Sequence, residues 1–161
     1  MGLLLTAEEL FQIAVQLESY GQSYYLELAD QITDPKLSEL FDSLAGEEEQ
    51  HYKQFTDYYK QATQKDWQIS KVDEETVDYI EALLGVRMFP PDKDVSMQAA
   101  AVHSTRDVLN TALAMEKDAL LFYRELVEMI SSELCPAVRM IINEERNHIT
   151  RLQEMLDSTP A

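Results

Sequence analysis

The stretch NEERNHITRL, residues 143–152, and its near-repeat GEEEQHYKQF, residues 46–55, are the most informative parts of this sequence for its fold. Each contains a glutamate followed three residues later by a histidine: Glu145 and His148, and Glu48 and His51. The chain has only three histidines, so two of them share one local pattern. Residues three apart on a helix point to the same side, so each stretch presents a carboxylate and an imidazole together.

A further glutamate precedes each repeat. Glu18 precedes Glu48 by nearly the same separation as Glu116 precedes Glu145. In all four segments, apolar residues recur at three- and four-residue steps on the same side as the glutamate. The stripe through Glu18, for example, contains Phe11, Ala14, Gly21, Tyr25 and Leu28. Such stripes face the core of a helical bundle, so we expect all four carboxylates to lie inside it.

The composition predicts an all-α fold with four long helices. Glycine (4) and proline (5) are scarce, and the apolar periodicity is helical rather than alternating. Thr6 with Glu9 forms a capping box, and Asp34 followed by Pro35 is typical of a helix start. We therefore expect helices at about 6–32, 34–62, 104–130 and 135–156.

The connections between these helices predict a ferritin-like four-helix bundle in one domain, residues 1–161. Short connections make the first two helices antiparallel neighbours, and likewise the last two. Between the pairs lies a crossover of about forty residues, 63–103, with an expected short helix at Glu74–Leu84 and the helix breaker FPPDKD at 89–94. A crossover that exchanges helices between two chains fits the same pattern.

The charge and cysteine content exclude several classes of protein. Thirty acidic residues stand against 13 basic ones, a net charge of −17, which argues against nucleic acid as a partner. Cys135 is the single cysteine, so the sequence has neither a disulfide nor a CxxC motif. The apolar run near the N-terminus is too short for a signal peptide or a membrane span. We expect a cytoplasmic protein without a membrane partner.

Four buried carboxylates need compensation, because an isolated charge in an apolar interior costs several kcal/mol. Two divalent cations would balance the four glutamate charges, and neutral imidazoles would complete their coordination. We therefore predict a dinuclear metal site. Its six ligands would be Glu18, Glu48, His51, Glu116, Glu145 and His148, with each Glu-x-x-His motif holding one ion and the other two glutamates chelating or bridging.

This ligand set resembles the dinuclear iron motif of the ferritin-like di-iron carboxylate superfamily. The stretch MEKDALLFYRELVE, residues 115–128, is similar to its rubrerythrin branch. The resemblance implies two Fe ions as cofactor, although Mn or Zn would accept the same ligands. It also implies an oxidoreductase that passes two electrons to hydrogen peroxide or oxygen, and a homodimer or small homo-oligomer.

Two departures from that family limit the assignment. Full-length rubrerythrins carry a rubredoxin domain with two CxxC pairs, whereas this chain would need an external electron donor such as a separate rubredoxin or reductase. Rubrerythrins also carry an extra carboxylate where this chain has Ala119, which weakens the peroxidase reading. The alternatives are a ferroxidase that sequesters iron and a helical bundle in which the metal is only a structural staple.

Four further residues are candidates for supporting the ligands. Tyr25 and Tyr123 each lie two helical turns after a lone glutamate, on the same side of the helix, where they could hydrogen-bond a ligand carboxylate or carry an electron. Glu47 and Glu144 each precede a ligand glutamate, where they could orient the histidine of the other motif.

Overall fold

The computed structural model describes residues 5–70, 72–84 and 104–161. These residues form helices and no strand, which confirms the predicted all-α class. The helices are α1 (Ala7–Gln31), α2 (Pro35–Lys65), α3 (Glu74–Leu84), α5 (Thr105–Met129) and α6 (Cys135–Ser158). The expected helix breaker at 89–94 lies outside the described residues.

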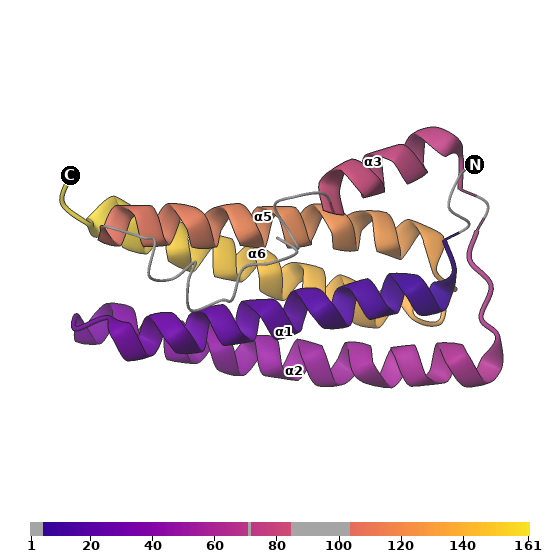
Figure 1. Cartoon of the computed structure of the whole chain (residues 1–161), viewed down its shortest axis with the longest axis horizontal. Helices are drawn as coiled ribbons and strands as arrows, with labels where there is room; N and C mark the ends of the chain where they lie inside the picture. The colour runs from indigo at the N-terminus through magenta and orange to yellow at the C-terminus, as the bar shows by residue number, and fades with distance from the viewer. Residues whose placement is uncertain (1–4, 71, 85–103) are drawn as a thin grey trace.

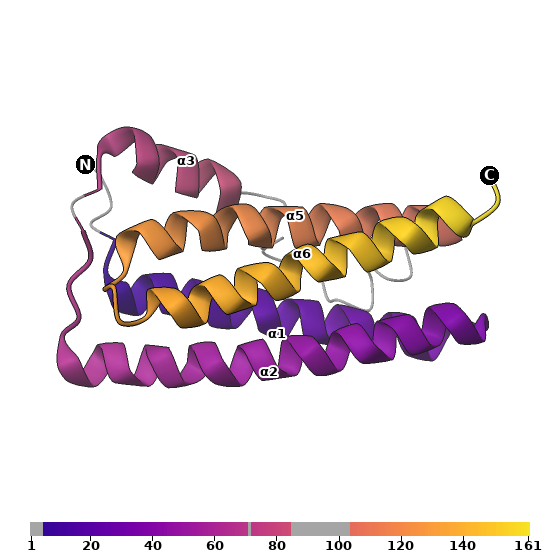
Figure 2. The same ribbon diagram turned by 180° about the vertical axis from the view of Figure 1, so that it is seen from behind.

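The four long helices form two antiparallel pairs, α1 with α2 and α5 with α6 (Figure 1). Seen from both sides, α1 lies beside α5 and α2 lies beside α6 (Figures 1 and 2). The last turn of α2 and the first turn of α5 lie at opposite ends of the bundle. The connection between the pairs therefore joins opposite ends, as the predicted crossover topology requires. The short helix α3 packs on the outside of α5.

The helix ends follow the capping signals in the sequence. The Thr6 hydroxyl accepts a hydrogen bond from the Glu9 amide at 3.1 Å, and the Glu9 carboxylate accepts one from the Thr6 amide at 2.9 Å. The Asp34 carboxylate caps α2, and Pro35 is its first residue. This helix continues past the expected end at residue 62, because no breaker occurs there, and ends at Asp66 in the left-handed region.

Two apolar clusters fill the interior, one toward each end of the bundle. One includes Phe11, Phe55 and Phe122, and the other includes Phe41 and Leu109, all of them fully buried. Among the described residues, the buried acidic residues and histidines lie in the middle of the helices, between these clusters. The apolar ends therefore hold the helices around a central polar layer.

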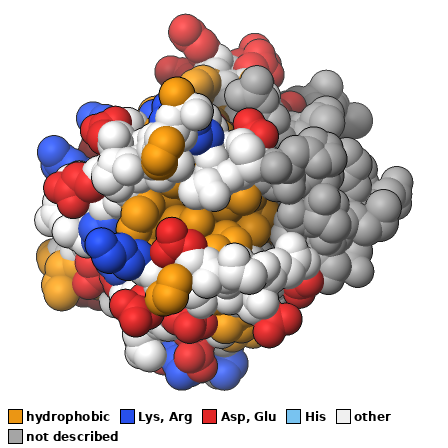
Figure 3. Space-filling model, turned by 90° about the vertical axis from the view of Figure 1, so that its left-hand side faces the viewer, with side chains coloured by type: hydrophobic (Ala, Val, Ile, Leu, Met, Phe, Trp, Pro, Cys, Tyr) orange, Lys and Arg blue, Asp and Glu red, His pale blue; other side chains and the backbone are white. Residues whose placement is uncertain are grey.

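The surface of the bundle is charged around this apolar interior. The view onto the end where α1 meets α2 shows apolar side chains at its centre, with acidic and basic side chains along the rim that the described residues form (Figure 3). Within the described residues, no helix combines the length and the apolar character needed to cross a membrane.

Candidate metal centre

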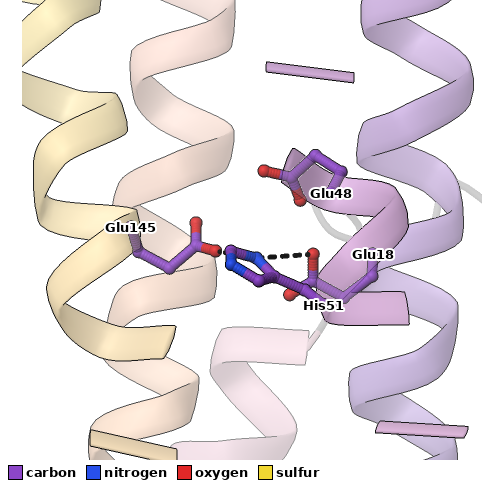
Figure 4. A group of neighbouring side chains, drawn as sticks. All are labelled: Glu18, Glu48, His51 and Glu145. Carbon is purple, nitrogen blue, oxygen red and sulfur yellow. Dashed lines mark ion pairs between the residues drawn. The ribbon is translucent and has the colours of Figure 1, made fainter. Parts of the chain in front are cut away.

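The central polar layer consists of the six residues predicted as metal ligands. All are buried, none more than 4 % exposed, and they come from the middle of all four long helices: Glu18, Glu48, His51, Glu116, Glu145 and His148. Figure 4 shows four of them pointing toward one another from α1, α2 and α6. The structure therefore brings the predicted residues together, because each occupies the core-facing stripe of its helix.

The six side chains form two overlapping groups of possible ligands. Glu18 and His51 belong to the first group, and Glu116 and His148 belong to the second. Glu48 and Glu145 belong to both, and within each group the donor atoms lie within 4.8 Å of one another. Glu18 and Glu116 would therefore each help to hold one ion, whereas Glu48 and Glu145 are placed to contribute to either.

The donor atoms at the centre of the layer lack hydrogen-bond partners. The Nδ1 atom of His51 lies 2.8 Å from Oε1 of Glu145 and 3.4 Å from Oε2 of Glu18 (Figure 4). The Nδ1 atom of His148 lies 3.0 Å from Oε1 of Glu48. None of these atoms makes a hydrogen bond of acceptable geometry, although all are buried. Buried donor and acceptor atoms normally find partners, so this convergence fits a site for cations.

The closely spaced carboxylates favour the presence of positive charge at the centre of the layer. Burial raises the pKa of Glu48 well above its usual range, and burial together with neighbouring carboxylates raises the pKa of Glu145 to about 8. Burial would lower the pKa of His51, but the adjacent Glu145 and Glu18 outweigh it and raise that pKa to about 11. The polypeptide's own groups thus retain protons that divalent cations could replace.

Two buried tyrosines orient the lone glutamates. The Tyr25 hydroxyl on α1 donates a hydrogen bond to Oε1 of Glu116 on α5, and the Tyr123 hydroxyl on α5 donates one to Oε1 of Glu18 on α1. Burial and the nearby carboxylates raise the pKa of both tyrosines well above 10, so both remain protonated donors. Each tyrosine thus supports the glutamate of the other helix pair, a pairing that the spacing along the chain does not reveal.

Two outer glutamates orient the histidines. The Nε2 atom of His51 lies 2.6 Å from Glu144, and the Nε2 atom of His148 lies 3.0 Å from Glu47. Each imidazole N–H can donate to this carboxylate, which leaves Nδ1 directed at the centre of the layer. The contacts proposed from the sequence between each outer glutamate and the other motif's histidine are present.

Arg151 is a supporting residue that the sequence analysis did not identify. Its Nη1 atom lies 2.6 Å from Oε1 of Glu47, and its Nη2 atom donates a hydrogen bond to Ser43 at 2.8 Å. Burial would raise the pKa of Glu47, but Arg151 and His148 together lower it below its usual value. The available signal was an arginine three residues after His148, but its partners are on α2 and only the packing of α6 against α2 reveals them.

A cavity of about 40 Å³ opens beside the layer, between α1 and α5. Gly21 and Ala119 line it together with the carboxylates of Glu18, Glu48 and Glu116. A Cβ atom on Gly21 would lie 3.1 Å from Oε2 of Glu48, so this position accepts no larger side chain without displacing that carboxylate. A water needs about 10–15 Å³ of such space, so the cavity accommodates a molecule of very few atoms.

Comparisons with known proteins agree with this geometry. The family model for rubrerythrin matches residues 9–90, just over half of the chain, including Glu18, Glu48 and His51. The crystal structure of a ferritin-like diiron-carboxylate protein from Thermotoga maritima has the same fold, with a TM-score of 0.71, 23% sequence identity and coverage of 97% of each chain. A comparison with curated proteins finds no match. The family match, supported by this fold, places the chain in the rubrerythrin family.

Proposed function

We propose that this protein is a dinuclear iron oxidoreductase that reduces hydrogen peroxide, or oxygen, with electrons from an external donor. The observation that carries the proposal is the pair of overlapping groups of buried carboxylates and imidazoles. Central atoms of these groups lack hydrogen-bond partners, and the chain belongs to the rubrerythrin family. A pair of bound iron ions would supply the two-electron redox chemistry that protein side chains lack.

Each of the two ions would have two ligands of its own and share two glutamates with the other ion. Glu18 and His51 would hold one ion, Glu116 and His148 the other, and the remaining two glutamates would contact both. Tyr123 occupies Oε1 of Glu18, which leaves Oε2 of this carboxylate facing His51, and Tyr25 holds Glu116 through Oε1, the oxygen that also lies 3.5 Å from His148. These contacts fix the ligands before any ion binds, and preorganised ligands bind metal more tightly.

The cavity between α1 and α5 supports a small oxidant as substrate. Its volume suits a molecule the size of peroxide or oxygen. It reaches the carboxylates of Glu18, Glu48 and Glu116 directly. The small side chain of Ala119 and the absence of one at Gly21 leave room for this approach.

A second candidate function is oxidation and sequestration of Fe(II). Ala119 leaves the site with four carboxylates, and the net charge of −17 attracts cations to the surface. In this case the iron would be the substrate as well as the catalyst, and no external electron donor would be needed.

Iron binding gives a direct measure of the site. We expect about two Fe(II) per chain after anaerobic reconstitution, because the donor atoms form two overlapping groups. The Glu48→Gln protein should bind Fe(II) at least about tenfold more weakly at both positions, since Glu48 belongs to both groups. Elemental analysis of the folded proteins gives the number of bound ions, and an anaerobic Fe(II) titration gives the affinities.

A neighbouring glutamate provides the matched control for this measurement. Glu49 is partly exposed and pairs with Lys53 at 2.8 Å on the surface of α2. The Glu49→Gln protein should therefore still bind two ions. One ion or fewer per chain at saturating Fe(II) in the unmodified protein would contradict the dinuclear site.

Turnover distinguishes the two candidate functions. With a rubredoxin and its reductase present, we expect many molecules of peroxide to be consumed per chain, because the donor restores the reduced iron after each cycle. The consumption of peroxide and of reducing equivalents can be followed together. Oxidation of added Fe(II) in fixed proportion, with retention of the product and no multiple turnover, would favour iron sequestration instead.

A further inference from the structure

The outer contacts of the two histidines follow the same plan in both halves of the bundle. Glu47 is hydrogen-bonded to His148, and Glu144 is hydrogen-bonded to His51, each across the α2–α6 interface. The residue three positions after each histidine lies one turn further along the same helix, where it can approach the outer glutamate. This residue is Arg151 in one half and Gln54 in the other.

The two halves differ at these positions. Arg151 contacts Glu47 at 2.6 Å and Ser43 at 2.8 Å, and the Ser43 hydroxyl donates a hydrogen bond to Glu47 at 3.1 Å. The Gln54 amide instead donates to the Tyr58 hydroxyl at 2.9 Å. Met140, four residues before Glu144 as Ser43 is four before Glu47, has no hydroxyl to donate.

The carboxylate of Glu144 accordingly acts on its histidine without competition from a cation. Among the residues that the structure describes, its recorded ion pair is with His51 alone, at 2.6 Å. Glu47 contacts both Arg151 and His148. Its carboxylate lies 3.0 Å from Nε2 of His148, a longer distance than the 2.6 Å between Glu144 and His51. A carboxylate that accepts the imidazole N–H makes the other ring nitrogen a better metal ligand, and a nearby cation weakens that effect.

We propose that Arg151 makes the two ion subsites unequal, so that the subsite of Glu18 and His51 binds a divalent ion more tightly than the subsite of Glu116 and His148. The inference rests on the proposed dinuclear centre and assigns Arg151 the role of a positioning residue. Arg151 acts in two ways, since its positive charge opposes a second cation nearby and its fork holds Glu47 in place. His148 is already fully buried, so the placement of Glu47 by Arg151 adds little to the affinity of this subsite. The positive charge of Arg151 therefore has the larger effect on that affinity.

Stepwise metal affinities test this inference without measuring activity. Anaerobic calorimetric titration with Co(II) should resolve two steps in the unmodified protein, separated by about tenfold or more beyond the statistical factor. In the Arg151→Gln protein the weaker step should strengthen, so that the two affinities approach each other. Arg151→Lys should keep the separation, because lysine retains the charge although it cannot reproduce the fork to Glu47 and Ser43.

A reciprocal variant tests the same idea in the other half. Gln54→Arg places a cation beside Glu144 and should weaken the tighter step by about tenfold, again reducing the separation. The His148→Gln protein should retain the tighter step and the His51→Gln protein only the weaker one, which assigns each step to its subsite. Circular dichroism of each variant shows whether the helices are retained.

The outcomes separate this inference from the proposed function. Two bound ions of equal affinity, or steps unchanged by both Arg151→Gln and Gln54→Arg, would overturn the role of Arg151 and leave the dinuclear centre standing. A further weakening of the weaker step in Arg151→Gln would also overturn it, since it would show that ordering outweighs charge. Binding of a single ion to the unmodified protein would contradict the dinuclear centre itself.

Discussion

Removing bound metal should lower the melting temperature of this protein by roughly 15 °C, the largest effect that the structure leads us to expect. An ion present at about 1,000 times its dissociation constant adds about 4 kcal/mol to the free energy of unfolding. Two ions should therefore add about 8 kcal/mol, and each kcal/mol shifts the melting temperature of a domain of this size by about 2–4 °C. Residual binding to the unfolded chain places the expected shift toward the lower end.

The Glu116→Leu substitution should remove much of this difference. Glu116 is a ligand candidate in one group only and is 4 % exposed, so leucine deletes a buried carboxylate and leaves the other group complete. Its loss also leaves the buried Tyr25 hydroxyl without its acceptor, which costs about 1–3 kcal/mol. The double variant Glu116→Leu, Tyr25→Phe should therefore melt at least as high as the unmodified protein when both are free of metal.

Differential scanning calorimetry with Fe(II) under argon, and with a chelator, measures these shifts. The Glu49→Gln change should retain the full difference between loaded and metal-free protein, since Glu49 is partly exposed and pairs with Lys53 at the surface. Equal melting temperatures with and without metal in the unmodified protein would contradict the coupling of metal binding to stability.

Peroxide should oxidise the reduced iron faster than oxygen does, because the chain belongs to the rubrerythrin family. Ala119 acts against this preference, since it lines the cavity beside Glu116 and adds no fifth carboxylate there. Ala119→Glu should therefore increase the preference for peroxide by about tenfold, which corresponds to about 1.4 kcal/mol of barrier difference. The experiment mixes the reduced protein with each oxidant at equal concentration and follows the near-ultraviolet absorption of Fe(III).

The Ala119→Gln protein is the matched control for this comparison. Glutamine occupies nearly the same volume in the cavity without adding a charge, so it separates blocked access from an added ligand. A faster reaction with oxygen in the unmodified protein would contradict the peroxidase function and favour iron oxidation and sequestration. Equal effects of glutamate and glutamine at this position would show that the volume, rather than the charge, controls the reaction.

Local pattern was enough to predict the helices and their core-facing sides. The capping residues Thr6 and Asp34 marked where helices begin, because a cap satisfies backbone groups only a few residues away. The apolar stripes through Glu18, Glu48, Glu116 and Glu145 showed which side of each helix is buried, because helical periodicity relates residues one turn apart. Fold class and the set of buried carboxylates were therefore predictable from neighbours along the chain.

The division of roles within the site came from how the helices pack. Glu48 and Glu145 lie in both groups of donor atoms, Tyr25 bonds the glutamate of the other helix pair, and Arg151 reaches Glu47 across the α2–α6 interface. Periodicity indicates the direction of a side chain but not which residue of a neighbouring helix it meets, since that depends on the axial offset between the helices. The glutamates shared by both groups, the crossed tyrosines and the unequal surroundings of the two histidines are therefore properties of the assembled bundle.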